Sequence, residues 1–269
     1  MNLCFSTFVY GWYQDFIPIY IYSILTAFPQ HHVKIFLHEQ LSETNKYCLS
    51  LIPSDNFEIV ENFKELDSCN IQHLSAYRFL LTRDHFKDFD YIYMGDVDFL
   101  IYNQFNDNFY DFYVSHCKKT KLPFSNEWNY DFGKYRMTGL HFMIKDPYFD
   151  QMDSWIENMK RGTNNFKTQS PQSPSLDEEM LHYMTFHAFD LRPLIGYRRP
   201  YHGLHFGIFK NIENSISFKY KNRIDQWIND KEKINDVLNS DLFKTFLQFM
   251  DPKAKRTVKI AQSTMKKIM

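Results

Sequence analysis

The sequence predicts an α/β fold, in which helices flank a mostly parallel central sheet, followed by a helical C-terminal appendage. Apolar segments typical of strands alternate with segments typical of helices in the first part of the chain, as in βαβ units. Two carboxylates, Asp96 and Asp98, directly follow one such strand, and a basic amphipathic segment ends the chain. We therefore expect one main domain over residues 1–215, which contains both carboxylates, and a helical appendage over residues 216–269.

The apolar pattern places each early element in turn. A helix that starts near residue 15 is expected to end before Pro29, because the residue before a proline disfavours helix. Residues 73–82 are expected to be helical, because apolar side chains and Arg78 recur there at helical spacing. The predicted strands are 3–9, 33–37, 57–60 and 90–94, a loop covers 10–14, and the predicted helices are 15–27, 41–51 and 73–82.

The pattern is less regular after Phe99. Predicted strands cover 109–114, 140–144 and 191–195, and predicted helices cover 148–159, a segment from Ser175 or Asp177 to 186, and most of 225–250. Predicted loops cover 123–134 and 162–174, and residues 201–210 are a loop or a strand. A long polar loop such as 162–174 is often a lid or a binding loop.

Composition excludes several classes of protein. Hydrophobic residues make up 44% of the 269 residues, enough for a large core, so disorder is not expected. The formal net charge of −1 argues against binding nucleic acid by bulk electrostatics. The four cysteines lack metal-ligand spacing and predict reduced thiols. The N-terminus lacks the basic region of a signal peptide, so we expect a cytoplasmic protein.

The pair Asp96 and Asp98 is the first candidate for chemistry. Carboxylates at the end of a buried strand are costly unless something pairs with them, and a hard, oxygen-preferring cation such as Mn²⁺ or Mg²⁺ is a suitable partner. A turn or helix cap is the simpler alternative. The chain has neither a G-x-G-x-x-G nor a G-x-x-x-x-G-K-[ST] motif, which argues against a dinucleotide oxidoreductase and a P-loop NTPase.

Several short segments resemble glycosyltransferases of the GT-A fold. Residues 94–99 (MGDVDF) resemble the D-x-D motif that follows a strand in that fold, and residues 76–80 (AYRFL) resemble the preceding helix, whose Arg lies near the donor phosphates or the carboxylates. Residues 137–142 (MTGLHF) resemble the strand where donor and acceptor meet. The resemblance covers about residues 1–210 and implies a Rossmann-like GT-A domain.

Two later segments resemble particular retaining families. Residues 177–181 (DEEML) resemble the D-E-x-x-L segment of the family that includes the blood-group A and B transferases. Residues 202–207 (HGLHFG) and Lys210 resemble a late region of family 8, in which a His completes the metal site and a Lys touches the diphosphate. The glycine and lysine spacing departs from that pattern, so the implied ligand is either His205 or His202.

The resemblance implies a role for each candidate residue. Asp96, Asp98 and His205 or His202 would bind Mn²⁺ or Mg²⁺, and Glu178, or else Asp177, would stabilise the cationic sugar or act as a nucleophile. The implied donor-binding residues are Thr7, Tyr10, Tyr13, Arg78, Asp96, Gly139, His141 and Lys210. Each residue also has a simpler structural explanation. Asp177 and Glu178 would be the acidic first turn that suits a helix N-terminus. Arg78 would cap a helix or form a surface ion pair, and the tyrosines would pack in the core.

The implied function is metal-dependent transfer of a hexose (Gal, Glc or an N-acetylhexosamine) from a UDP-sugar to a saccharide acceptor, with retention, in bacterial surface glycan synthesis. The C-terminal segment 255–269, if helical, places Val258, Ala261, Met265 and Ile268 on one side and Lys255, Lys259 and Lys266 on another. This pattern suits an anionic membrane surface and a lipid-linked acceptor. A solvated helix is the alternative there. Other functions considered are a nucleotidyltransferase acting on sugar phosphates and a non-catalytic carbohydrate- or membrane-binding module.

Overall fold

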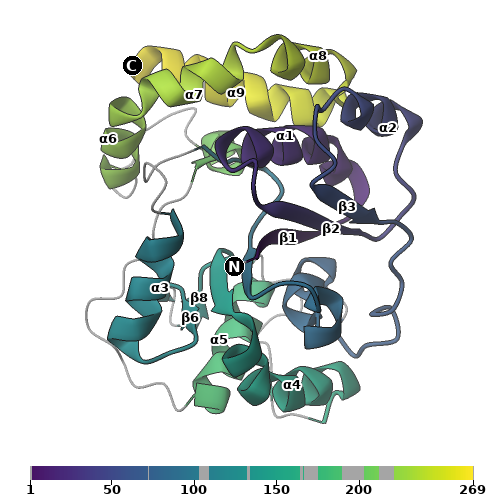
Figure 1. The fold of residues 1–269 in the computed structure, drawn as a ribbon, viewed down its shortest axis with the longest axis vertical. Coiled ribbons are helices and arrows are strands. Elements are labelled where there is room, and N and C mark those ends of the chain that lie inside the picture. Colours follow the sequence, from purple (N-terminus) through teal and green to yellow (C-terminus); the bar gives the residue numbers. More distant parts are fainter. Residues whose placement is uncertain are drawn as a thin grey trace.

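The computed structural model describes residues 2–71, 73–102, 109–131, 134–163, 166, 175–189, 203–211 and 221–268. Its central sheet has six strands among these residues, in the order β3–β2–β1–β4–β9–β6 (Figure 1). The strands are β1 (Leu3–Val9), β2 (His32–Leu37), β3 (Phe57–Val60), β4 (Tyr91–Met94), β6 (Phe124–Ser125) and β9 (His141–Ile144). The first four in the order are mutually parallel, and β9 runs antiparallel to both of its neighbours. The predicted mostly parallel sheet is confirmed.

Helices cover both faces of this sheet because successive residues of a strand point to opposite faces and both sets are apolar here. Phe5 and Tyr93 pack with α1 (Ile17–Ala27), α2 (Glu43–Ser50) and α3 (Phe109–Thr120) on one face. Cys4 and Ile92 pack on the other face. That second face is covered by the 3₁₀ helices η2 (Leu74–Leu80) and η3 (Arg83–Phe86) and by α4 (Lys145–Arg161) and α5 (Leu176–Phe189).

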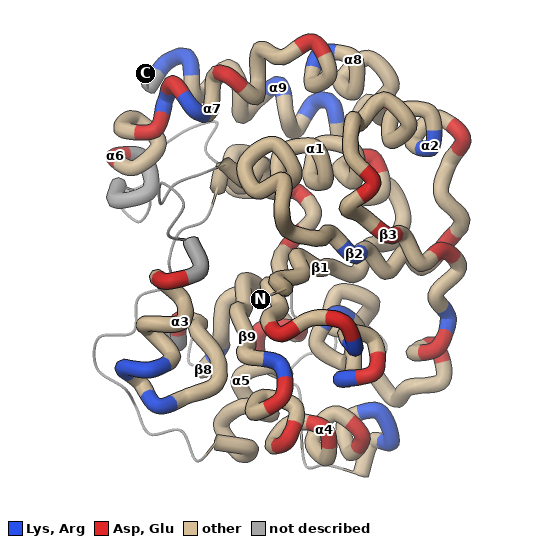
Figure 2. Tube along the Cα trace, viewed as in Figure 1, with Lys and Arg blue, Asp and Glu red and all other residues tan. Residues whose placement is uncertain are grey.

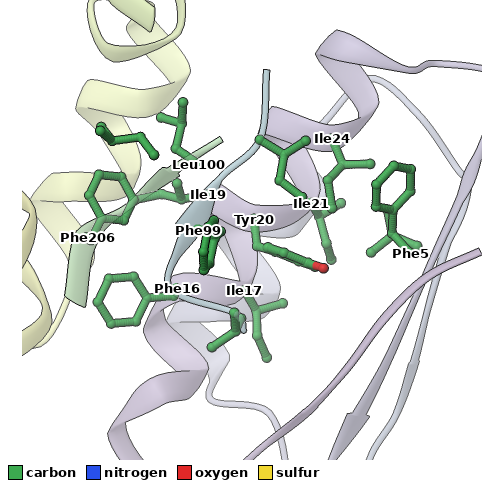
Figure 3. Close-up of a cluster of buried hydrophobic side chains, with 14 of the residues drawn as sticks. Phe5, Phe16, Ile17, Ile19, Tyr20, Ile21, Ile24, Phe99, Leu100 and Phe206 are labelled. Carbon is green, nitrogen blue, oxygen red and sulfur yellow. The ribbon is translucent and has the colours of Figure 1, made fainter. Parts of the chain in front are cut away.

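Helix α1 is the centre of the first core. Its segment IPIYIYSILTA is apolar around most of its circumference, and Pro18 lies in the first turn, where a proline is tolerated. Figure 3 shows Ile17 and Tyr20 of α1 between Phe5 on one side and Phe99 on the other. Phe99 belongs to β5 (Phe99–Leu100), which pairs antiparallel with β10 (Leu204–His205). The chain directly after Asp98 is thereby fixed against the core.

Residues 109–114 form part of a helix, so the predicted strand there is wrong. Their aromatic content favours a strand, but Tyr113 and Cys117, one helical turn apart, are both buried. The Tyr113 ring stacks on Phe142 of β9 with 4.9 Å between ring centroids. Packing against the sheet therefore decides the helical conformation over the local propensity.

Other boundaries also differ from the prediction. The expected loop 123–134 contains β6, β7 (Trp128–Asp131) and the start of β8 (Lys134–Met137), and β7 and β8 form a hairpin. Residues 74–80 are a 3₁₀ helix, and a further 3₁₀ helix, η1 (Gly11–Phe16), occupies the expected loop after β1. The segment 203–211 contains β10 and η4 (Phe206–Asn211). The predicted strand 191–195 and most of the predicted loop 162–174 lie outside the described residues.

The C-terminal helices pack against the domain on the side of α1 (Figure 1). They are α6 (Lys221–Asn229), α7 (Lys231–Leu238), α8 (Asp241–Phe249) and α9 (Pro252–Ile268). Val258, Ala261 and Met265, the apolar side expected to face a membrane, are buried in the core that also holds α1. The basic residues Arg256 and Lys259 are exposed, and Figure 2 shows the blue segments along α9.

A search of the described helices for a membrane span finds none that is both sufficiently long and sufficiently apolar to cross a bilayer.

Candidate functional site

A cavity of about 590 Å³ opens beyond the carboxyl ends of β1 and β4. These strands pair in parallel, with Ser6 opposite Met94, so the segments that follow them meet at one edge of the sheet. The backbone N–H of Gly95 extends the pairing by donating to the Ser6 carbonyl at 3.1 Å. The lining residues are Thr7, Phe8, Val9, Tyr10, Tyr13, His73, Ser75, Arg78, Asp96, Val97, Asp98, Arg136, Ser175, Asp177, Glu178 and His205.

Arg78 is the buried cation of the site. Its guanidinium binds the Asp96 carboxylate and donates to Asp177 Oδ2 at 2.5 Å, across 99 residues of sequence. Burial opposes the charge of Arg78, but the two carboxylates outweigh this effect, so the pKa of Arg78 is raised. Arg78 therefore links the end of β4 to the first turn of α5.

Gly139 lies against this ion pair, between β8 and β9. A Cβ atom at this position would stand 2.8 Å from Arg78 Nη2 and 3.1 Å from Asp96 Oδ2. Any side chain larger than hydrogen would therefore push against the ion pair, which explains a glycine in the MTGLHF segment. Gly139 is next to the cavity but does not line it.

Asp98 and His205 also line the cavity and lie next to each other. The β5–β10 pairing puts His205 beside Phe99, on which its ring stacks with 4.4 Å between centroids. His205 Nε2 then lies 3.1 Å from Asp98 Oδ1. The Phe206 N–H also donates to the Asp98 carbonyl at 2.9 Å, so both side chain and backbone of Asp98 are held by this late segment.

The atoms around Asp98 fit one part of a cation site. Two adjacent ligands of an octahedral ion, each about 2.1 Å from it, stand about 3 Å apart, close to the Asp98–His205 separation. A Cβ on Gly207 would lie 2.6 Å from Asp98 Oδ2 and 2.8 Å from His205 Nε2, so only glycine leaves this space open. Oxygen and imidazole ligands suit Mn²⁺.

Asp96 does not join that pair. It is bound to Arg78, and within the described ranges no group of three His, Cys, Asp or Glu side chains is arranged to hold a metal ion. A cation at Asp98 and His205 would therefore take its other ligands from water, from a bound phosphate, or from Asp96 after it leaves Arg78. His202 lies outside the described residues.

Glu178 is held differently from its neighbour Asp177. Glu178 Oε2 accepts from Arg136 Nη1 of β8 at 3.0 Å, and Oε1 accepts from the Gly139 N–H at 3.1 Å. The side chain of Glu178 is 23% exposed, whereas that of Asp177 is 8% exposed and engaged by Arg78. Of the two carboxylates, Glu178 is therefore the one that can reach a ligand in the cavity.

Burial raises the pKa of Glu178 to about 7, and Asp177 and Asp96 add to this effect, while Arg136 and Arg78 oppose it. Between pH 4.5, the ordinary value, and pH 7 the folded protein holds a proton that the unfolded chain has lost. The contribution of Glu178 to stability therefore decreases as pH rises across this window and is constant above it.

Glu178→Gln is expected to remove this pH dependence. The difference in Tm between the variant and the parent protein should grow in favour of the variant as pH rises from 4.5 to 7. Thermal unfolding at half-unit pH intervals measures it. Glu157→Gln on α4, a partly exposed carboxylate that is ion-paired outside the cavity, is the matched control. Parallel Tm curves for the parent and Glu178→Gln would contradict the raised pKa.

The aromatic wall of the cavity comes from the end of β1 and from η1. Tyr10 and Tyr13 line it, with 6.1 Å between their ring centroids, and Thr7, which lies near the carboxyl end of β1, also lines it. Burial, followed by the charge of Asp98, raises the pKa of Tyr13 to about 12, so its hydroxyl stays protonated and can donate. The ring of Trp12 instead contacts that of Tyr13 in a tilted arrangement, and Lys253 Nζ of α9 lies over it, 4.4 Å from its centroid.

His141 is placed away from the cavity. It is fully buried in β9 among Phe124 and Tyr148, and burial lowers its pKa to about 3, so the imidazole is neutral. Its Nδ1 therefore accepts from Asn126 Nδ2 at 2.9 Å. His141 therefore does not reach the cavity and is not placed to contact a sugar donor there. Lys210 is in η4, and its side chain lies outside the described part of the chain.

Sequence reasoning missed several lining residues. Arg136, His73, Ser75 and Ser175 carry no recognisable motif, and they reach the cavity only through the three-dimensional packing. His73 Nδ1 and Ser75 Oγ lie 2.6 Å apart at the start of η2. The available signal was the proximity in sequence of each to a residue already selected: His73 and Ser75 to Arg78, Arg136 to Gly139, and Ser175 to Asp177.

The chain is therefore an α/β protein with a cavity at the carboxyl ends of its parallel strands, and carboxylates outnumber guanidinium groups in the lining of that cavity. No protein-family model matches the chain, and no curated protein matches it. Solved structures do match.

One match is the galactosyltransferase LgtC in complex with donor and acceptor sugar analogs, with 14% identity, a TM-score of 0.42, and coverage of 68% of this chain and 69% of that one. Another is the bifunctional glycosyltransferase WbbM, with 13% identity and a TM-score of 0.48, which covers 96% of this chain; the match spans 51% of WbbM. The glycosyltransferase GlyE of Streptococcus pneumoniae TIGR4 matches with 10% identity and a TM-score of 0.44, over 99% of this chain and 64% of that one.

Proposed function

We propose that this protein is a divalent-metal-dependent glycosyltransferase that moves a hexose from a nucleotide sugar, a UDP-sugar, to a saccharide acceptor. The observation that carries the proposal is the shared cavity, which brings Asp98 and His205, Arg78 with Asp96, and Glu178 to one place beside two tyrosines. Its volume of about 590 Å³ lies within the usual range for small-molecule sites. The resemblance of the MGDVDF and DEEML segments supports the same reading.

The charges of the lining residues suit this reaction. Four carboxylates and two guanidinium groups face the cavity, an excess of negative charge that favours a divalent cation. Asp98 and His205 would hold Mn²⁺ or Mg²⁺, which when bound neutralises the charge of the diphosphate leaving group. Tyr10 and Tyr13 offer aromatic faces for the base, and the Thr7 hydroxyl lies on the same wall.

In this proposal Glu178 faces the anomeric carbon of the donor sugar. Transfer breaks the bond between that carbon and the diphosphate oxygen, which keeps the electron pair, and forms a bond to the acceptor hydroxyl, which loses its proton. An ionised Glu178 stabilises the cationic sugar, or adds to it as a nucleophile, by analogy with retaining glycosidases. Asp177 instead neutralises Arg78. Retention, transfer of Gal, Glc or an N-acetylhexosamine, and a bacterial surface glycan as product belong to the proposal.

The basic, solvent-exposed side of α9 suggests where in the cell the protein acts. Its exposed Arg256, Lys259, Lys266 and Lys267 suit an anionic membrane surface on the cytoplasmic side, where a lipid-linked acceptor would lie. The apolar side of α9 is used by the core, so such contact would be electrostatic rather than insertive. The competing nucleotidyltransferase reading would favour a basic loop after β1, and the described lining residues from β1 and η1 include no Lys or Arg.

A donor screen tests the proposal. UDP-, GDP-, ADP- and CMP-sugars are added with Mn²⁺, with Mg²⁺ or with chelator, and Tm is recorded. One class of donor, expected to be the UDP-sugars, should raise Tm by several degrees only when the metal is present, because a ligand of the native state adds stability. Mass spectrometry should then show that donor hydrolysed slowly, and its sugar added to an acceptor saccharide. If no nucleotide sugar raises Tm or is hydrolysed with either metal, the proposed glycosyl transfer is wrong.

A further inference from the structure

Arg136 is a cavity residue with no assigned role, and its contacts point to one. It belongs to β8 of the β7–β8 hairpin, which packs along α5, and its side chain is 26% exposed. Its guanidinium donates to Glu178 Oε2 at 3.0 Å. We propose that Arg136 is a positioning residue that, together with the backbone N–H of Gly139, holds both oxygens of the Glu178 carboxylate in one orientation toward the cavity. The inference rests on the proposed function of Glu178.

Both donors come from one short segment, and that segment is itself fixed. Thr138, between Arg136 and Gly139, donates through its N–H at 3.1 Å and its hydroxyl at 2.7 Å to Asn126 Oδ1. Asn126 Nδ2 in turn donates to the Thr138 carbonyl at 3.1 Å and to His141 Nδ1. Asn126 and His141 are fully or almost fully buried. The buried His141 thus supports the site indirectly, because it accepts a hydrogen bond from the Asn126 side-chain amide, which in turn binds Thr138.

A purely stabilising role explains this arrangement poorly. An ion pair between partly exposed side chains makes a measurable but small contribution to stability, and Glu178 is ionised at a cost, because its surroundings favour the neutral acid. A fixed carboxylate beside a reacting centre is instead what catalysis requires, since misplacement by about 1 Å can cost about 100-fold in rate. The adjacent Asp177 is engaged by a different arginine, Arg78, so the two carboxylates do not compete for one cation.

Arg136 also acts on the charge of Glu178. The charged groups that face Glu178 are Asp177 on the same helix, Asp96 after β4, Arg78 on η2 and Arg136 on β8. Arg136 is the larger of the two groups that lower the pKa of Glu178. Loss of this positive charge should therefore move the acid limb of the activity profile to higher pH, while loss of geometry alone should not.

The experiment compares Arg136→Gln, Arg136→Lys and the control Arg161→Gln, an exposed arginine at the end of α4. With the donor found in the screen, Arg136→Gln should lower kcat at pH 7 by about tenfold to 100-fold, the scale expected when the Glu178 carboxylate is misplaced by up to about 1 Å, and change the donor KM by less than about threefold. Its acid limb should move to higher pH. Arg136→Lys should keep the acid limb in place and recover part of kcat. An unchanged kcat and pH profile in Arg136→Gln would overturn the inference.

A second measurement does not depend on activity. Tm is recorded at pH 8 for Arg136→Gln, Glu178→Gln and the double variant. If the pair is joined as described, the two single shifts should not add, because interacting neighbours give non-additive changes. Additive shifts would overturn the inference even in a fully active enzyme. If no donor is transferred by the parent protein, the proposed function fails, and this cycle alone decides whether Arg136 holds Glu178.

Discussion

Replacing Asp96 and Asp98 together by asparagine is expected to abolish sugar transfer and to remove the effect of Mn²⁺ on nucleotide binding. Asparagine keeps the size of each side chain but removes both negative charges, so the proposed diphosphate and cation would lose their anchor. We expect a loss of at least about 1,000-fold in kcat/KM, the scale of several kcal/mol that metal-held charge stabilisation supplies. Initial rates and nucleotide titrations with and without Mn²⁺ measure both effects.

The single variants separate the two carboxylates. Asp98 faces His205, whereas Asp96 is bound to Arg78, so Asp98→Asn should remove the Mn²⁺ dependence more completely than Asp96→Asn. Asp96→Asn leaves Arg78 with Asp177 and should lower Tm more than Asp98→Asn. Asp84→Asn, an exposed carboxylate on η3, is the matched control. Full activity of the double variant in the presence of chelator would contradict the metal role.

Deleting residues 216–269 is expected to prevent folding rather than to release a working domain. The core around α1 continues into the C-terminal helices through Ile234, Phe243, Phe246 and Val258, which are all buried. Full burial of such side chains contributes about 1.5–3 kcal/mol each, so their sum is comparable with the whole stability of a typical domain, about 5–15 kcal/mol. Phe16 and Phe206, which stack on each other in the same core, would be left partly exposed.

Circular dichroism and thermal unfolding of residues 1–215 check this expectation. We expect aggregation or a broad, non-cooperative transition. Removal of residues 266–269 alone is the control, because Lys266 and Lys267 are exposed and the buried Met265 is retained. A cooperative transition with the parent Tm in the long deletion would show instead that the boundary near residue 215 separates two independent units.

The early half of the fold follows from sequence because each strand has a strong apolar run and each helix a clear stop. Residues 3–9 and 57–60 were predicted with the bounds that the structure gives. The later half does not, since β6 has only two residues, too few for a periodic signal, and α3 carries aromatic residues typical of strands. Tertiary packing against β9 decides these segments, and no local pattern reports it.

The candidate site divides in the same way. Asp96 and Asp98 were recognisable because two charges directly after a buried strand need a partner. The pairing of Asp98 with His205 and of Glu178 with Arg136 depends on contacts between segments far apart in the chain, which spacing does not encode. His141 illustrates the opposite case: its motif-like setting beside Gly139 suggested a ligand contact, but the β9 pairing turns it into the core.

The β5–β10 pairing makes the candidate site dependent on how the chain is synthesised. Asp98 and His205 are separated by about a hundred residues, and bringing them together closes a long loop whose entropy must be offset by later contacts. The helices that bury η4, α9 above all, follow both of these residues in the sequence and are synthesised after them. A nascent chain that ends before His205 therefore carries Asp96 and Asp98 without the histidine, and the cavity is complete only after the C-terminal helices have been synthesised and have packed.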